Sequence, residues 1–267
     1  MLIGNTRIGG IGSLSVKNTY DPDALAYLTA VEAADGQALE NSVKIAINTF
    51  VVGCKTDGIW TAIKASCILA GARTLSGALV PLAGNAPTNA NFVSGDYSRK
   101  TGLLGDGSSK YLNANRLNSA DPKNSKHLSV YCTSGQSLDG SRVIIGNQNG
   151  TTNSLIFTTI SQTLSLRINY SSPATAFNIS GVLTGLIGAS RYSASQVNAF
   201  YGGSLLAHDH NSAVVASSNA IYVFTNGITL TQYSNARISF YSIGESIDLS
   251  LLNSRITTLM TTLNALL

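Results

Sequence analysis

Short stretches in which apolar and polar residues alternate fill residues 106–245. Alternation with a period of two places apolar side chains on one face of a β-strand, and Gly, Asn, Ser and Pro residues between the stretches form turns. In residues 127–133, Leu128, Val130 and Cys132 alternate with His, Ser and Tyr, which predicts a half-buried strand. Strands are expected at residues 109–114, 127–133, 142–146, 153–160, 163–170, 182–192, 196–201, 220–225 and 237–243. Strands at such regular intervals predict a mainly β fold, an antiparallel β-sandwich.

Apolar residues recur every three or four positions on both sides of this block, which is the spacing of one helix face. Asp21 and Pro22 form a helix start signal, and Asp248 is placed to cap a later helix. We expect Trp60 in the core because it shares a helical apolar period with the residues that follow it, and Gly71 should end that helix. The predicted helices cover residues 22–34, 37–54, 59–70 and 248–267.

The last predicted helix carries leucine and isoleucine residues at alternating spacings of four and three, as in a coiled coil. The pattern lasts for only about two heptads, which is too short for a coiled coil to stand alone. We therefore expect this helix to dock on its own sandwich, the alternative being association with another copy.

The first 20 residues form a Gly-rich apolar arm with no helical or strand period. Its large apolar side chains are Leu2, Ile3, Ile8, Ile11, Leu14 and Val16. Exposed apolar segments favour a docking site on a partner, and the alternative is that the arm lies along its own domain. Residues 72–105 are rich in loop-forming residues and indicate a boundary nearby. The expected organisation is a docking arm (1–20), a helical module with a linker (21–95) and a sandwich domain with a closing helix (96–267).

Only 11% of the residues are charged, so the polar surface is built from Ser, Thr, Asn and Gly. Such a surface suits a protein packed among other copies or partners. The net charge of +4 is spread without clusters of Lys or Arg, which argues against nucleic-acid binding. No apolar run approaches the roughly 20 residues of a membrane span.

The chain has three cysteines, Cys54, Cys67 and Cys132, which form no CxxC pair. We expect them to be small buried apolar residues and not disulfides or metal ligands, consistent with folding in a reducing cytoplasm. The N-terminus does not have the pattern of a secretory signal, because Arg7 and several glycines interrupt its apolar residues.

The densest group of polar candidates is the run His208, Asp209, His210 and Asn211. A metal site would need a third ligand at a recognisable spacing, so we expect a polar loop that contacts a ligand and not a metal centre. There is no GxSxG nucleophile motif and no phosphate-binding loop. We expect no catalytic residues, no cofactor and no metal.

Four segments in order resemble concanavalin-A-like, laminin-G-like jelly-roll domains: GDGSSKYL at 105–112, the strand at 127–133, VNAFYGGSLL at 197–206 and RISFYSIGE at 237–245. The resemblance covers roughly residues 105–265 and implies a jelly-roll sandwich that ends in a strand and a short Leu-rich helix. Members that bind calcium use acidic loop residues, and glucanase members use clustered carboxylates. Neither cluster is present in this block. The whole chain, including the GNTRIGGIG arm and a helix over residues 67–69, also resembles virion structural proteins of tailed bacteriophages.

The resemblance implies a non-enzymatic virion protein of the tail, fibre or capsid, assembled in the host bacterial cytoplasm. Its arm would bind other virion proteins, its sandwich would bind host cell-surface polysaccharide or serve assembly, and it would form homo-oligomers. Neither nucleic acid nor membrane insertion is expected. The alternative is a glycan-cleaving enzyme on the same fold, which would require a pair of carboxylates in a cleft.

Overall fold

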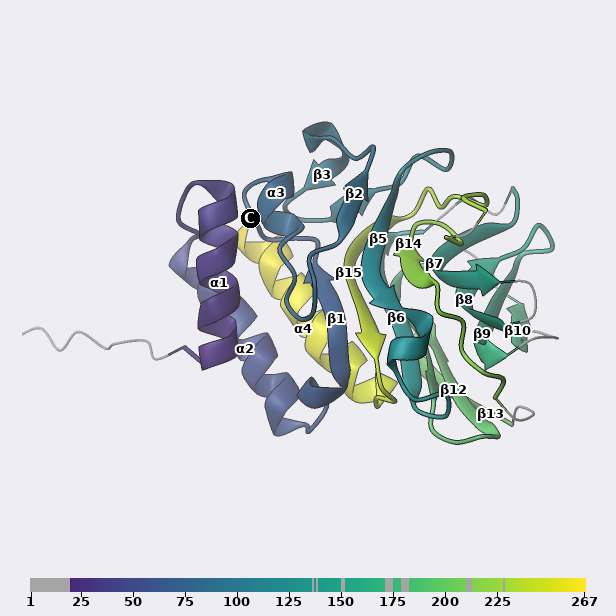
Figure 1. Ribbon diagram of the computed structural model, residues 1–267. Helices are drawn as coiled ribbons and strands as arrows, with labels where there is room; N and C mark the ends of the chain where they lie inside the picture. Colours follow the sequence, from purple (N-terminus) through teal and green to yellow (C-terminus); the bar gives the residue numbers. More distant parts are fainter. Residues whose placement is uncertain are drawn as a thin grey trace, which may run out of the picture.

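Two antiparallel β-sheets stacked face to face make up the larger part of the protein (Figure 1). The computed structural model describes residues 20–135, 137, 139–149, 152–170, 175–178, 183–209, 213–227 and 229–267. Sheet A runs in the order β13 (Ser204–Asp209), β12 (Gln196–Tyr201), β11 (Gly185–Arg191), β6 (Lys126–Ser134), β15 (Arg237–Gly244), β4 (Gly102–Leu104) and β3 (Tyr97–Ser98), and β1 (Ile63–Ile68) also pairs with β15. Sheet B runs in the order β10 (Thr175–Asn178), β9 (Thr163–Tyr170), β8 (Thr152–Thr158), β7 (Arg142–Asn149), β14 (Ala220–Val223), β5 (Tyr111–Leu117) and β2 (Thr88–Ala90). The predicted antiparallel sandwich with flanking helices is confirmed.

Helices cover the face of sheet A that points away from sheet B (Figure 1). They are α1 (Pro22–Asp35), α2 (Asn41–Thr56), the short α3 (Leu75–Ala78) and α4 (Leu249–Leu266). Single 3-10 turns lie at Trp60–Ala62, Ser94–Asp96 and Asn118–Ala120. The protein therefore has one apolar core between the sheets and a second between sheet A and the helices.

Because both faces of sheet A are covered, the prediction of a half-buried strand at residues 127–133 is wrong. Leu128 faces the core between the sheets, whereas His127 and Ser129 are fully buried on the other side. The His127 ring bonds the Ser242 hydroxyl at 2.7 Å (Nε2 to Oγ) and the Glu245 carbonyl oxygen at 2.5 Å from Nδ1. The polar side chains of His127 and Ser129 suggested, in the sequence, that this face is exposed to solvent.

The predicted helix over residues 59–70, and with it the helix proposed for residues 67–69, is also wrong. The segment forms a 3-10 turn followed by β1, whose Cys67 and Ile68 pair with Tyr241 and Phe240 of β15. Alternate residues enter the two cores, so the strand is apolar on both faces and its sequence cannot be distinguished from a buried helix. Gly71 follows a strand and does not end a helix.

The C-terminal helix docks on its own chain, as predicted. The Asp248 carboxylate caps α4 by accepting from the backbone N–H groups of Ser250 at 2.8 Å and Leu251 at 3.1 Å. The apolar face of α4 packs against sheet A and α2, where Arg255 forms a bidentate ion pair with Asp57 (Nε to Oδ2 2.6 Å, Nη2 to Oδ1 2.7 Å).

The three cysteines are buried and free, as predicted. Burial raises the pKa of the Cys54, Cys67 and Cys132 thiols to about 12, so these thiols stay protonated. None of the described helices is long and apolar enough to span a membrane. The predicted arm lies outside the described residues, except for Tyr20.

Candidate functional site

An open groove of 610 Å³ runs between α1 and the edge of sheet A at β1. A smaller hollow of 370 Å³ adjoins it, and the two share Asp23, Trp60 and Thr61. We call the combined depression the Trp60 groove. Its remaining lining residues are Ala26, Tyr27, Ala30, Lys55, Gly58, Ile63, Lys64 and the segment 80–83.

Small side chains on α1 keep the groove open. Asp21 caps this helix by accepting from the Asp23 N–H at 3.0 Å, and Pro22 occupies the first turn. Ala26 and Ala30 then lie one turn apart on the exposed face, where none of the described residues places a bulky side chain above Tyr27.

The opposite wall is fixed by the segment 80–83, which pairs with β1. The Ser66 N–H donates to the Ala83 carbonyl at 3.0 Å, and the Leu82 N–H donates to the Ser66 carbonyl at 2.9 Å. Gly84, with φ of +78°, allows this approach, because a Cβ there would lie 2.4 Å from the Lys64 carbonyl oxygen. The two walls are therefore held by separate elements of the fold.

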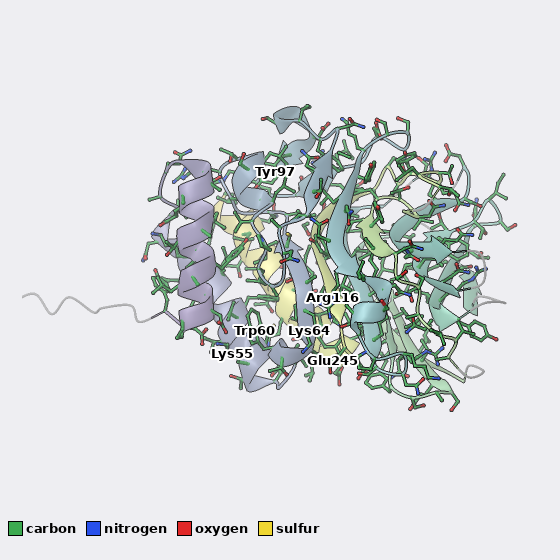
Figure 2. The ribbon with its side chains drawn as sticks, viewed as in Figure 1. Lys55, Trp60, Lys64, Tyr97, Arg116 and Glu245 are labelled. Carbon is green, nitrogen blue, oxygen red and sulfur yellow. The ribbon has the colours of Figure 1, made fainter. Side chains whose placement is uncertain are left out.

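Trp60 lines both hollows and is only partly buried, so the prediction that it is a core residue is wrong. Figure 2 shows its position near Lys55. Its indole N–H donates to Asp23 Oδ2 at 3.0 Å. The Lys55 ammonium lies 5.8 Å from the ring centroid, within cation–π range. These two contacts fix the orientation of the ring, and the rest of the side chain lines the groove.

Two carboxylates and one ammonium form the charged rim beside the ring. Lys55 Nζ binds Asp21 Oδ1 at 2.6 Å and Asp23 Oδ2 at 2.7 Å, and about half of the Asp23 side chain (53%) remains exposed. The hydrogen bond to Lys55 lowers the pKa of Asp21, and the bonds to Asp21 and Asp23 raise the pKa of Lys55. Lys64, further along the groove, pairs with Glu245 at 2.9 Å (Figure 2).

The groove combines an apolar floor, one oriented aromatic ring and a few exposed donors and acceptors. This is the usual composition of a site that orients a small polar ligand through few contacts. Among the described side chains, no group of three His, Cys, Asp or Glu residues could hold a metal ion.

Two of the four candidates predicted from the sequence, His208 and Asp209, can be placed, and neither lines the groove. His208 and Asp209 end strand β13, opposite Val197 and Gln196 of β12, so the predicted loop is wrong for these two residues. The Gly202–Gly203 turn joins β12 and β13 in a hairpin whose pairing extends as far as Asp209. Strand β13 is the edge of sheet A farthest from β1. His210 and Asn211 lie outside the described residues. A ligand-binding role for these four residues stays a prediction.

Sequence reasoning missed the Trp60 groove because Trp60 was assigned to a helix core. One signal was available, since Trp60 follows the Asp57-Gly58 turn almost directly and precedes Thr61. An Asp-Gly pair marks a turn, so a residue directly after it can lie at the start of a new element and not inside a helix. The contribution of α1 could not be seen, because its residues lie more than 30 positions away.

No protein-family model and no curated protein matches this chain. Solved structures do match in fold. The binding domain of botulinum neurotoxin serotype D has a TM-score of 0.51 at 14% identity over 74% of this chain and 50% of that one. A mutant Trypanosoma rangeli sialidase that displays trans-sialidase activity has a TM-score of 0.52 at 10% identity over 81% of this chain and 39% of that one.

A third structure, of botulinum neurotoxin type C, is described as entering cells through interaction with two ganglioside molecules. It has a TM-score of 0.50 at 13% identity over 78% of this chain and 53% of that one. The match thus covers about half the length of the toxin chains and less than half the length of the sialidase chain. At these identities the likeness concerns the fold alone, and the chain is similar in fold to β-sandwich domains of this kind.

Proposed function

We propose that this protein is a non-enzymatic, glycan-binding component of a bacteriophage particle and that the Trp60 groove is its glycan site. The observation that carries the proposal is the fixed orientation of the Trp60 ring beside exposed hydrogen-bonding groups. A sugar ring has an apolar face of C–H groups and a rim of hydroxyls. A flat aromatic surface with polar groups at its edge matches both parts.

The polar groups around the ring supply both kinds of hydrogen bond. Asp23 offers carboxylate acceptors, Thr61 an exposed hydroxyl, and Lys64, which also pairs with Glu245, an ammonium donor. The groove is open at the surface and continues into the adjoining hollow, so several sugar units of a polysaccharide could lie along it. The proposed ligand class is therefore host cell-surface polysaccharide.

The enzyme alternative has one observation in its favour, because Asp23 lines the groove and the Asp21 carboxylate binds the same Lys55 ammonium. Glycoside hydrolysis by paired carboxylates requires one of them to be protonated so that it can act as the acid. Here the Lys55 ammonium lies between the two and pairs with both, and its hydrogen bond to Asp21 lowers the pKa of that carboxyl group. This arrangement supports binding rather than hydrolysis.

The phage role is supported by the sequence resemblance and by the uncharged polar composition. We propose that the first 20 residues attach the protein to other virion proteins, in the tail, a fibre or the capsid, and that several copies assemble together. Assembly would take place in the host cytoplasm. Localising the chain within purified particles tests this part of the proposal separately from glycan binding.

The test of the glycan site is binding to an array of bacterial surface polysaccharides, followed by titration of variants. Truncating a tryptophan at the centre of a binding site costs about 2 kcal/mol or more, so Trp60→Ala should weaken binding by roughly 30-fold. Trp60→Phe should retain part of the affinity because it keeps an aromatic face.

The matched control is Tyr233→Ala, which removes a partly buried aromatic residue outside the groove, next to Tyr111 at 6.3 Å between ring centroids. It should leave the affinity unchanged. If Tyr233→Ala abolished binding and Trp60→Ala did not, the glycan site would be the tyrosine cluster and the assignment would be wrong. Absence of binding to every polysaccharide would overturn the proposed function itself.

A further inference from the structure

A second, apolar groove of 330 Å³ lies between α2 and α4. Ile45, Thr49 and Phe50 line it from α2, and Thr258, Leu259 and Leu266 line it from α4. The Thr49 hydroxyl donates to the Ile45 carbonyl at 2.8 Å, and the Thr258 hydroxyl donates to the Ser254 carbonyl at 2.8 Å. Because these hydroxyls are bound to their own helices, the threonines contribute little polarity to the groove.

The rim of this groove leaves large apolar side chains in water. Ile45 and Leu266, which both line the groove, are each 42% exposed. Exposed large apolar side chains beside an apolar groove are typical of a docking site. This groove shares no lining residue with the Trp60 groove, so the two sites are separate.

The point at which the N-terminal segment joins the fold is beside this rim. The Tyr20 hydroxyl donates to Asn41 Oδ1 at 2.9 Å, and the Asp21 N–H donates to Asn48 Oδ1 at 2.7 Å. Ile45 is four residues after Asn41 and three before Asn48, so its side chain lies on the same face of α2 as both. The chain that precedes Tyr20 therefore starts within about one helical turn of the groove.

We propose that the groove between α2 and α4 is the docking site for residues 14–16 of the same chain, with Leu14 and Val16 as the apolar anchors. An extended chain covers about 3.3 Å per residue, so Val16 reaches roughly 13 Å and Leu14 roughly 20 Å from Tyr20. Lys17, Asn18 and Thr19 form the polar connection. Residues 1–12 stay available for a partner, so the proposal is compatible with an attachment role for the arm.

The test is disulfide trapping between the segment and the groove in the full-length chain. Val16→Cys is combined with Thr49→Cys in the groove and, as a control, with Thr29→Cys on α1. Thr29 is a matched position, because it is exposed and its hydroxyl also donates to the carbonyl four residues earlier, at 2.8 Å. The native cysteines are buried and do not compete.

Under mild oxidation the bridge between positions 16 and 49 should form within the monomer at least tenfold faster than the control bridge between positions 16 and 29. Equal rates for the two pairs would overturn the proposal. Bridges that form mainly between two molecules would also overturn it, because they would show that the groove takes the arm of another copy.

A second measurement does not depend on the cysteine pair. A fluorine label at Thr258→Cys reports on the groove, and Leu14→Ser with Val16→Ser should shift its resonance while a label at Thr29→Cys stays unchanged. A resonance at position 258 that does not move would contradict the docking. Glycan binding should be the same in all these variants, so failure here is distinguishable from failure of the Trp60 site.

Discussion

Removing the charge of Asp121 should destabilise the protein more than most single substitutions. The Asp121 and Lys126 side chains are both fully buried, and their ion pair measures 3.0 Å from Nζ to Oδ2. Arg116 binds the same carboxylate, with Nε 3.1 Å from Oδ2 and a second contact from Nη2 to Oδ1. Asp121→Asn would leave the Lys126 ammonium buried with neutral acceptors only, among them the Asn118 carbonyl at 3.1 Å.

The magnitude follows from the burial of the partner that remains. Breaking a buried ion pair on one side costs about 3–5 kcal/mol. The lower end applies here, because Arg116 is 20% exposed and can turn to water, and Lys126 keeps one hydrogen bond. We expect a loss of about 3 kcal/mol at pH 7. Asp121→Asn combined with Lys126→Met should recover at least half of it, since the unpaired charge is then removed.

The loss should depend on pH in a defined direction. Burial alone would raise the pKa of Asp121, but the hydrogen bond from Arg116 and the charge of Lys126 outweigh it, so the pKa lies below its usual value. A carboxyl group with a depressed folded-state pKa stabilises the fold above its unfolded pKa of about 3.9, and this contribution is lost as the pH falls through the folded value. The difference in the free energy of unfolding between wild type and Asp121→Asn should therefore become smaller below about pH 4.

Urea denaturation followed by far-UV circular dichroism at pH 7 and pH 3.5 measures both effects. The physical reasoning would be refuted by a loss below about 1 kcal/mol at pH 7, which is the range of exposed pairs. If the difference in the free energy of unfolding between wild type and Asp121→Asn were the same at pH 3.5 as at pH 7, the effect could not be assigned to the Asp121 charge.

Three further predictions concern other parts of the fold. Burial lowers the pKa of His127 to about 4, so stability should fall by about 3 kcal/mol as the pH drops from the unfolded value near 6.5 towards 4. The His127→Gln variant should not show this loss of stability between pH 6.5 and pH 4. If its stability fell with pH as steeply as that of the wild type, the loss could not be assigned to His127. Gly84→Ala should cost about 2 kcal/mol or more, against about 1 for Gly36→Ala, because both have positive φ but only Gly84 meets neighbouring backbone. Equal thermal unfolding temperatures for the two would contradict this. Asp248→Ala should cost about 1 kcal/mol through loss of the α4 cap, whereas Asp248→Asn should be nearly neutral in the same urea assay.

Strands with clear turn residues at both ends could be predicted to the residue. The expected strands at 163–170 and 196–201 coincide with β9 and β12. In each case an alternating run ends at Gly, Ser or Asn residues, and local pattern alone fixes the boundaries. The capping residues Asp21 and Asp248 were equally local signals, and both accept backbone hydrogen bonds as expected.

Elements that depend on distant partners were missed. Strands β2, β3 and β4 have only two or three residues, which is too short for alternation to be seen. They form because they pair with strands that are distant in the sequence, as Leu103 pairs with Ile238. The same applies to β1, whose partner β15 lies near the other end of the chain.

The candidate site was missed for the same physical reason. Trp60, Asp23 and Lys55 meet because α1, α2 and the 3-10 turn converge at one end of the helical layer. No run of the sequence contains the three together. The run that begins at His208 was predicted to be a ligand-binding loop because its polar residues are adjacent. Asp209 is nevertheless paired with Gln196 within the regular β12–β13 ladder.

The most direct test of the central claim uses the fact that Trp60 is the only tryptophan of the chain. Its fluorescence should change and saturate as an oligosaccharide from a bound polysaccharide is added to the wild-type protein. The midpoint should agree with the affinity measured by calorimetry. Calorimetric binding with no change in tryptophan emission at any ligand concentration would contradict the claim that the glycan lies on Trp60.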